Sequence, residues 1–141
     1  MSNYNYSSSR TTYQGEYKPR DKDQPLDTVS AIIWDKYKQE PSFITSSWDG
    51  YLRYYLIKSN GDVDKAWQIF LQHPIICCDI NENNIAFAGL ASGDVVAVSL
   101  ENSSIVCLGA HEAPINGIFW LKEKGCLITL GFDNLIKFWT L

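Results

Sequence analysis

"SSWDGYLRYY" at residues 46–55 and "GFDNLIKFW" at residues 131–139 are two versions of one pattern. In each, an aspartate is followed by a turn-forming residue and then by aliphatic, basic and aromatic residues, a composition typical of a β-strand. A weaker version, "SGDVVAV" at residues 92–98, lies between them and has Ser92 in place of the aspartate. The versions are 43 and 41 residues apart, so the chain contains three copies of a repeat.

Each copy also has a characteristic beginning. "TVSAIIW" at residues 28–34 matches "PINGIFW" at residues 114–120, and "PIICCDI" at residues 74–80 is the weak middle copy. Short β-branched and aromatic runs, separated by Pro, Gly, Asn and Asp, indicate eleven strands in all, with three in the last copy. Residues 62–72, "DVDKAWQIFLQ", also suit a helix, but their place in the repeat favours a strand over the second half.

A period of 40–45 residues with four short strands is the signature of a WD-repeat β-propeller blade. The sequence therefore predicts an all-β fold of three WD-type blades of the four-stranded kind, the last of which has three of its four strands; this is an incomplete propeller. We place the blades at about residues 28–71, 74–108 and 111–141. The aspartate at the end of the second strand can accept hydrogen bonds from backbone N–H groups of the turn, and the Gly or Asn after it tolerates positive φ.

Residues 1–27 form a different segment. After the initiator Met they contain one aliphatic residue, Leu26, and no period of 2 or 3.6. Such a segment buries too little apolar surface to offset the entropy lost on ordering, so we predict a disordered, polar, Tyr-rich tail. Its four tyrosines are expected to be solvated, with contact to a partner as the alternative; they are Tyr4, Tyr6, Tyr13 and Tyr17.

The 141 residues, 45% of them hydrophobic, are enough for one domain core. The chain carries a net charge of -4, and residues 28–141 contain eight basic and twelve acidic residues. This balance argues against a broad phosphate-binding surface, and only a weak RNA contact at a local basic patch is left open. No apolar run reaches the roughly 20 residues that span a bilayer, and no secretory signal is evident, so we expect a soluble, intracellular protein without membrane insertion.

The four cysteines form no CxxC pair and lie in apolar runs, where we expect buried, reduced thiols; they are Cys77, Cys78, Cys107 and Cys126. His73 lies close enough to Cys77 and Cys78 to suggest a metal ligand set or a Cys–His nucleophile. Adjacent strand residues point to opposite faces, however, which favours core packing over a shared metal. Since no catalytic or phosphate-binding motif is present either, we expect no enzyme activity, no metal and no cofactor.

Four residues of the third copy resemble the hydrogen-bonded tetrad of a WD blade: His111, Thr129, Asp133 and Trp139. The first copy has Asp49 at the matching position but no His, and the second copy lacks both the Asp and the Trp. The resemblance implies that these residues are structural, and His111 as a catalytic base is the weaker alternative.

"HEAPINGIFWLKEKGCLITLGFDNLIKFW" at residues 111–139 is similar to a blade of the mRNA-export propeller family that associates with nuclear pores. "LDTVSAIIW" at residues 26–34, together with residues 46–55, resembles the first blade of that family. The sister family of spindle-checkpoint propellers shares the Ser-Trp-Asp and Phe-Asp turns but generally not the Ala-Pro after His111, which favours the export family. The resemblance covers about residues 26–141.

The resemblance implies a non-catalytic scaffold that binds a short nucleoporin peptide in mRNA export, at the nuclear pore or in the nucleus, with the cytoplasm left open. One alternative is a checkpoint adaptor that binds checkpoint-kinase peptides. Another is an architectural subunit of a large complex. Members of both families have seven blades, so closure of the ring is expected to require further blades from the same gene, from partners or from self-association.

In WD propellers the top face is formed around the start of each first strand and just before the turn aspartate. The corresponding residues here are Ser30, Trp48, Ile76, Ala91, Asn116 and Phe132. Trp48 and Phe132 are the main candidates for partner binding, because aromatic side chains on a rigid rim are favoured peptide anchors; packing between blades is the alternative. Arg53 and Lys137 occupy matching third-strand positions, where they could pair with an acidic partner segment, and Arg53 is included among the partner-binding candidates; solvated side chains or pairing between blades are the alternatives.

Overall fold

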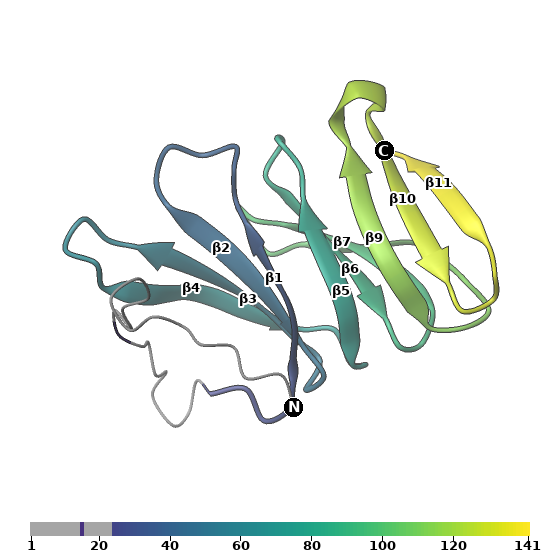
Figure 1. Ribbon diagram of the computed structural model, residues 1–141, viewed down its shortest axis with the longest axis horizontal. Helices are drawn as coiled ribbons and strands as arrows, with labels where there is room; N and C mark the ends of the chain where they lie inside the picture. The colour runs from purple at the N-terminus through teal and green to yellow at the C-terminus, as the bar shows by residue number, and fades with distance from the viewer. Residues whose placement is uncertain (1–14, 16–23) are drawn as a thin grey trace, which may run out of the picture.

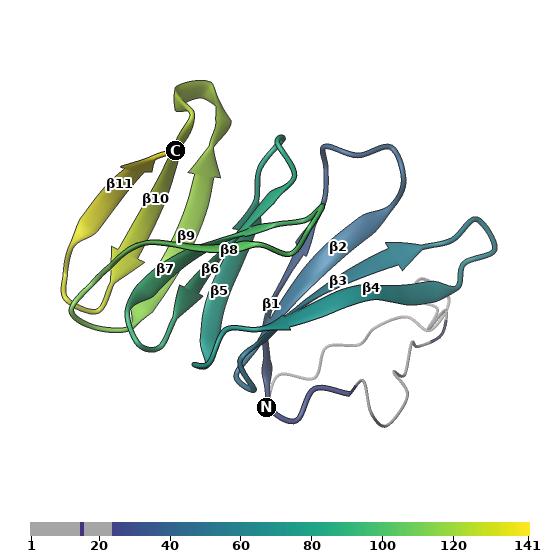
Figure 2. The same cartoon turned by 180° about the vertical axis from the view of Figure 1, so that it is seen from behind.

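The computed structural model describes residue 15 and residues 24–141, which form three antiparallel sheets arranged face to face (Figures 1 and 2). The strands of the first sheet, blade 1, are β1 (Val29–Trp34), β2 (Ser42–Ser47), β3 (Tyr51–Ile57) and β4 (Val63–Phe70). Blade 2 consists of β5 (Ile75–Ile80), β6 (Ile85–Leu90), β7 (Asp94–Ser99) and β8 (Ile105–Ala110). Blade 3 consists of β9 (Ile115–Leu121), β10 (Cys126–Gly131) and β11 (Ile136–Thr140), with a single 3₁₀ turn, η2 (Lys122–Lys124), between β9 and β10.

The prediction of an all-β incomplete propeller is confirmed. The strands of each sheet follow one another in sequence order, from the first strand to the last, as in a β-meander. β4 is a strand, so the helical alternative for residues 62–72 does not apply. The predicted disordered tail, with its four tyrosines, lies mostly outside the described residues; residues 24–28 contain no strand.

The turn between the second and third strands has the same backbone conformation in all three blades. Gly50, Gly93 and Asn134 adopt φ values of 87°, 94° and 67° at equivalent positions. Left-handed backbone of this kind is favourable for glycine and tolerated by asparagine. At Gly93 a side chain is also excluded sterically, since a Cβ there would overlap the carbonyl oxygen of His111.

Alternating side chains of blade 2 supply two apolar layers. On β7, Val96 and Val98 face blade 1, where they pack in a cluster with Ile44 and Leu52. Val95 and Ala97, on the other side of the same strand, pack in a second cluster with residues of blade 3; its buried members are Phe87, Val95, Ala97, Ile115, Trp120 and Leu127. Blade 2 is therefore covered on both faces, as the near-continuous apolar sequence of β6 and β7 requires.

The far face of blade 3 is apolar and exposed. Phe119 and Phe138 both lie opposite Ile128 in the register of the sheet, and their exposed fractions are 55% and 68%. The opposite side of β9 behaves differently, because Trp120 is only 6% exposed. Its ring stacks on Phe87 at a centroid distance of 5.4 Å, and its indole N–H donates a hydrogen bond of 2.7 Å to Glu82 of blade 2.

The cysteines are all free thiols, but the expectation that all four are buried needs correction. Cys78 and Cys126 are buried and Cys77 is half-buried, whereas Cys107 is exposed because it lies on β8, the outermost strand of blade 2. Burial raises the pKa of Cys77 and of Cys78 to about 12, so both remain protonated thiols. Cys78 packs against blade 1 and Cys77 against the blade 3 side, which separates the two sulfur atoms onto opposite faces of the sheet.

Two further features concern only the described part of the chain. No group of three or more His, Cys, Asp or Glu side chains there has an arrangement that could hold a metal ion. None of its helical segments has the length and apolar character needed to cross a bilayer.

Trp120→Ala should destabilise the fold strongly. The variant loses the buried ring and its stack and leaves Glu82 without its indole partner, and we expect the free energy of unfolding to fall by about 3–5 kcal/mol. Phe119→Ala, at the adjacent exposed position, should cost less than about 1 kcal/mol. Urea unfolding followed by tryptophan fluorescence and circular dichroism measures both values. Equal losses in the two variants would contradict the proposed packing of blade 3 on blade 2.

Candidate protein-interaction face

The turn of blade 3 is closed by four side chains that are joined by hydrogen bonds. The Nδ1 atom of His111 lies 2.9 Å from Oδ1 of Asp133, and its Nε2 atom lies 2.7 Å from the hydroxyl oxygen of Thr129. The indole N–H of Trp139 donates to the same hydroxyl oxygen over 2.8 Å. His111 and Thr129 are 3% and 0% exposed, so these polar groups are satisfied inside the protein, as buried polar groups must be.

Asp133 also organises the backbone of the turn. Its carboxylate accepts hydrogen bonds from the N–H groups of Leu135 and Glu112, each 3.1 Å long. Desolvation acts to raise the pKa of Asp133, but the hydrogen bond with His111 and the two backbone donors outweigh it and lower the pKa. Lys137, on the neighbouring β11, donates to the carbonyl oxygen of Ala110 over 2.8 Å, which ties the same strand to the end of blade 2.

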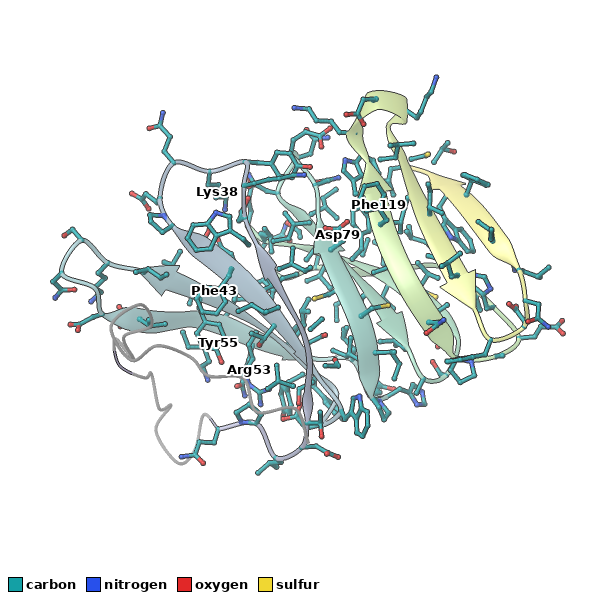
Figure 3. The ribbon with its side chains drawn as sticks, viewed as in Figure 1. Lys38, Phe43, Arg53, Tyr55, Asp79 and Phe119 are labelled. Carbon is teal, nitrogen blue, oxygen red and sulfur yellow. The ribbon has the colours of Figure 1, made fainter. Side chains whose placement is uncertain are left out.

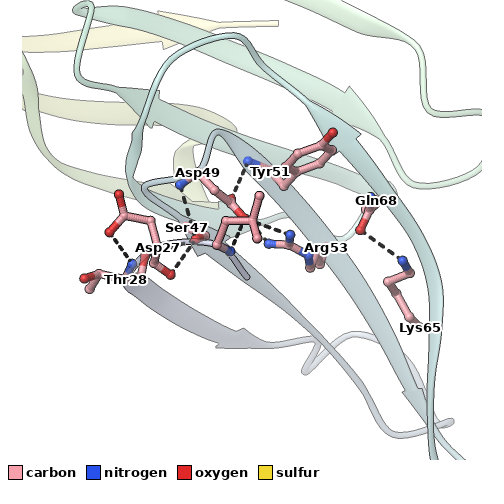
Figure 4. Close-up of polar contacts among 9 residues, drawn as sticks. Asp27, Thr28, Ser47, Asp49, Tyr51, Arg53, Lys65 and Gln68 are labelled. Carbon is pink, nitrogen blue, oxygen red and sulfur yellow. Dashed lines mark hydrogen bonds and ion pairs between the residues drawn. The ribbon is translucent and has the colours of Figure 1, made fainter. Parts of the chain in front are cut away.

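Blade 1 satisfies the equivalent aspartate with an arginine in place of the histidine. Arg53 donates to Oδ2 of Asp49 over 2.8 Å, and the two side chains are only 3% and 5% exposed (Figure 4). Asp49 also accepts the N–H groups of Tyr51 and Leu26, the latter from the segment before β1. In blade 1, Arg53 thus neutralises Asp49. In blade 3, the equivalent carboxylate of Asp133 is contacted by His111. The assignment of Arg53 to partner binding is therefore corrected, because its guanidinium is buried and paired.

The environment of Asp49 favours its charged form. Burial by itself raises the pKa of this carboxyl, but the hydrogen bond and charge of Arg53, together with the two backbone N–H donors, lower the pKa below the ordinary value. The guanidinium of Arg53 also lies 5.0 Å from the centroid of the Tyr51 ring, a cation–π distance. Asp49, Arg53 and Tyr51 therefore form one structural unit at the open side of blade 1.

The turn of blade 2 has neither arrangement. Ser92 occupies the place of the aspartate, and its hydroxyl donates to Oδ2 of Asp94 over 2.9 Å at the protein surface. Blade 2 depends less on hydrogen bonds at its turn, because its strands β6 and β7 are buried between blades 1 and 3. Among the three described blades, only blade 3 has the complete hydrogen-bonded tetrad, in agreement with the sequence, where the third copy alone contains all four residues.

The predicted top-face residues at the start of each first strand share one local structure. Ser30, Ile76 and Asn116 each occupy a β-bulge, the extra residue between two paired neighbours of β1, β5 and β9. Their surroundings differ. The hydroxyl of Ser30 donates to the carbonyl oxygen of Ile75 over 2.6 Å and so joins blade 1 to blade 2, whereas Asn116 is exposed.

The residues before the turn are held by matching backbone hydrogen bonds. The N–H groups of Trp48, Ala91 and Phe132 donate to the carbonyl oxygens of Thr28, Pro74 and Pro114 over 2.8–2.9 Å. The side chains of Trp48 and Phe132 are 48% and 62% exposed, so the three described blades leave about half of each uncovered. Their two turns lie at the same end of the molecule (Figures 1 and 2). This end therefore presents two aromatic side chains on fixed backbone.

The sequence reasoning missed a group of residues at the opposite end. Lys36, Tyr37 and Lys122 lie in the β1–β2 and β9–β10 connections, for which the sequence predicts no role. The signal that could have singled them out is the alternation of lysines with an aromatic residue in "WDKYK" at residues 34–38.

The comparisons with known proteins agree with the fold and with the resemblance. No model of a known protein family matches the chain. The mitotic checkpoint protein BUB3.3 of Arabidopsis thaliana is 28% identical over 113 residues, which are 80% of this chain and 34% of that protein. The mitotic checkpoint protein bub-3 of Caenorhabditis elegans is 22% identical over 116 residues, and the mRNA export factor GLE2 of Chaetomium thermophilum is 25% identical over 121 residues. Each of these two matches covers 82% of this chain and 34% of the relative.

Solved structures match in the same way. The WD40 propeller domain of Doa1 has a TM-score of 0.68 at 13% identity, covering 83% of this chain and 38% of that one. The C-terminal WD40 domain of Sif2 has a TM-score of 0.68 at 17% identity, covering 82% of this chain and 34% of that one. The chain has the WD40 propeller fold and spans about a third of the length of the curated relatives it matches. The predicted resemblance to export and checkpoint propellers is confirmed, since proteins of both kinds match.

Thr129→Val should destabilise blade 3. The substitution keeps the side-chain volume but removes the hydroxyl that both His111 and Trp139 contact, and two buried donors or acceptors lose their partner. We expect a loss of about 2–3 kcal/mol in the free energy of unfolding. Thr45→Val, at the same repeat position of blade 1, is the matched control and should cost less than about 1 kcal/mol, because the described part of the chain shows no hydrogen bond to its hydroxyl. Chemical unfolding measures the loss of free energy of unfolding in each variant. Equal losses in the two variants would mean that the tetrad does not contribute to stability.

Asp49→Asn should change how stability depends on pH. Since the folded-state pKa of Asp49 is lowered, its contribution is present above the unfolded pKa of about 3.9 and is lost as the pH falls through the folded pKa. At pH 7 we expect the variant to lose about 2–4 kcal/mol, because Arg53 is left as an unpaired buried charge. Below about pH 4 the difference from the wild-type protein should shrink.

Unfolding free energies measured between pH 7 and pH 2 test this dependence. Asp64→Asn, which removes an exposed carboxylate paired with Lys58, controls for loss of a surface charge and should change the stability at pH 7 by less than about 1 kcal/mol. A difference between Asp49→Asn and wild type that stays constant down to pH 2 would exclude a charged Asp49 as the stabilising group.

Proposed function

We propose that the chain is part of a non-catalytic WD40 propeller scaffold that binds a short nucleoporin peptide and takes part in mRNA export at the nuclear pore. The observation that supports this function best is the pair of exposed aromatic side chains, Trp48 and Phe132, at equivalent positions of blades 1 and 3. Aromatic side chains that protrude from a rigid frame supply large contact areas at little entropic cost and are typical anchors in peptide recognition.

The frame under each aromatic residue is stiff for identifiable reasons. Trp48 precedes Asp49, which is locked by Arg53, and Phe132 precedes Asp133, which is locked by His111. The backbone N–H of each aromatic residue is also bound to the loop before the first strand of its blade. A peptide that binds across this end therefore meets two anchors whose positions are set before binding, which reduces the ordering cost.

Asn116 is the polar member of the proposed site. It is exposed at the β-bulge of β9, on the strand that starts next to the loop holding Phe132. An amide side chain can donate to and accept from the backbone of an extended peptide. Ser30 contributes less in this proposal, because its hydroxyl is already bound within the inter-blade contact.

A second candidate function is that of a checkpoint adaptor, and one specific observation favours it. Two of the three relatives described above are named mitotic checkpoint proteins, and the one from Arabidopsis thaliana has the highest identity of the three. The two candidates use the same face but predict different peptides. Both place the protein in the nucleus during part of its work, and the export function adds the nuclear pore.

Peptide binding measured by fluorescence anisotropy tests the proposal. A labelled nucleoporin hairpin peptide should bind the protein, and Trp48→Ala and Phe132→Ala should each weaken binding about tenfold or more, because each removes a buried anchor of about 1.4 kcal/mol or more. Trp34→Ala is the matched control. It removes a tryptophan of similar exposure, 53%, from the opposite end of β1 and should leave the affinity unchanged.

The result also separates the two functions. Binding of a checkpoint-kinase peptide, with no binding of the nucleoporin peptide, would replace the export function by the checkpoint function. Binding that is insensitive to Trp48→Ala and Phe132→Ala would place the peptide elsewhere and remove the support that these residues give.

A further inference from the structure

The end of the molecule opposite Trp48 and Phe132 carries a pocket. The β1–β2, β5–β6 and β9–β10 connections all lie at this end (Figures 1 and 2). A cavity of about 380 Å³ lies between the connection of blade 1 and the end of β9 in blade 3; it is lined by Lys36, Tyr37, Phe119, Trp120, Lys122 and Glu123. Segments far apart in the sequence thus form one site.

Two ammonium groups flank one aromatic ring in this pocket. The Nζ atom of Lys36 lies 5.3 Å from the centroid of the Tyr37 ring, and the Nζ atom of Lys122 lies 5.6 Å from the same centroid. Within the described residues neither lysine takes part in an ion pair. Lys36 acts on Asp79 at longer range, where burial raises the pKa of that carboxyl and the charge of Lys36 opposes the rise. Neither lysine has a carboxylate at ion-pair distance, however, and the two ammonium groups repel each other, so a carboxylate bound between them is favourable.

The carboxylates closest to this end of blade 2 are already engaged. Asp79 accepts the backbone N–H of Trp120 over 2.7 Å, and Glu82 accepts the indole N–H of the same residue over 2.7 Å. Figure 3 shows Asp79 and Phe119 on neighbouring strands toward this end of the molecule. Trp120 donates to both carboxylates, which hold the wall of the pocket in place. Within the described residues neither carboxylate forms an ion pair with Lys36 or Lys122, although the charge of Lys36 opposes the rise in the pKa of Asp79 that burial causes.

The other wall is also fixed before any ligand binds. The backbone N–H of Tyr37 donates to Oδ1 of Asp35 over 3.1 Å, in a turn that orients the ring. Lys38, the next basic residue, is held by the hydroxyl oxygen of Tyr54 at 3.0 Å and so leaves the pocket to Lys36 and Lys122. Both walls therefore combine an aromatic ring with a lysine that has no carboxylate at ion-pair distance among the described residues.

We propose that this pocket binds an acidic segment of a protein partner, with a carboxylate held between Lys36 and Lys122 and an apolar side chain packed on the exposed ring of Phe119. Charge complementarity and the aromatic lining identify the occupant. A nucleic acid fits less well, since its binding needs a row of cations along many phosphates, and here two lysines stand beside Glu123 on a chain of net charge -4. This site is separate from the face that contains Trp48 and Phe132, and either can fail without the other.

Fluorescence anisotropy with a defined synthetic peptide tests the site. The labelled acidic peptide Glu-Asp-Phe-Asp-Glu-Glu is titrated with the wild-type protein and with the double variant Lys36→Glu/Lys122→Glu, at low and at physiological salt. We expect the double variant to bind about tenfold or more weakly, and Glu123→Gln to bind about twofold to threefold more tightly, because the changes act on the charge around one carboxylate. Circular dichroism and thermal unfolding verify that each variant is folded.

Lys124→Glu is the matched control. Lys124 belongs to the same 3₁₀ turn as Lys122 but does not line the pocket, so its reversal should weaken binding by less than about threefold through long-range charge alone. Equal effects of Lys124→Glu and Lys122→Glu would overturn the proposal, and so would equal binding of the amide peptide Gln-Asn-Phe-Asn-Gln-Gln. Tighter binding of a uridine decamer than of the acidic peptide, with the same dependence on Lys36 and Lys122, would overturn it in favour of RNA.

Discussion

The structure depends on the burial of one apolar sheet face against another. A four-stranded sheet with apolar side chains on both faces is not stable by itself, because each apolar face must be covered by a neighbouring sheet to be removed from water. Blade 2 shows the result most clearly, since Val95 and Val96, adjacent in the sequence, are both buried, each in a different inter-blade layer. The outer face of blade 3, with exposed Phe119 and Phe138, shows the same sheet chemistry without a neighbour.

The turn aspartates are a second physical constraint, and each blade stabilises its turn with different residues. An aspartate that binds the backbone N–H groups of a turn is partly desolvated, so its carboxylate needs a further polar partner. In blade 3 that partner is His111, itself held by Thr129 and Trp139, and in blade 1 it is Arg53 from the third strand. Blade 2 does without a partner because Ser92 carries no charge and both faces of the sheet are covered.

Rigid turns and covered sheets together create two ends with different chemistry. At one end the turns present Trp48 and Phe132 on backbone that is already bound, which suits a peptide with apolar anchors. At the other end the connections bring Lys36 and Lys122 beside the ring of Tyr37, where we propose that an acidic segment binds. The two proposed sites share no residues, so occupation of one leaves the residues of the other uncovered.

The sequence by itself determined the number of repeats, the eleven strands, the form of the turns and the set of residues that closes blade 3. These features are local or repeat at a fixed period, so strand alternation and turn chemistry specify them without knowledge of distant contacts. Only the tertiary structure decided that Arg53 is buried against Asp49, that Ser30 joins two blades, that Cys107 is exposed and that Lys122 lies over Tyr37. Each of these outcomes depends on which sheet or loop covers a residue, and coverage is set by packing between segments that are distant in the sequence.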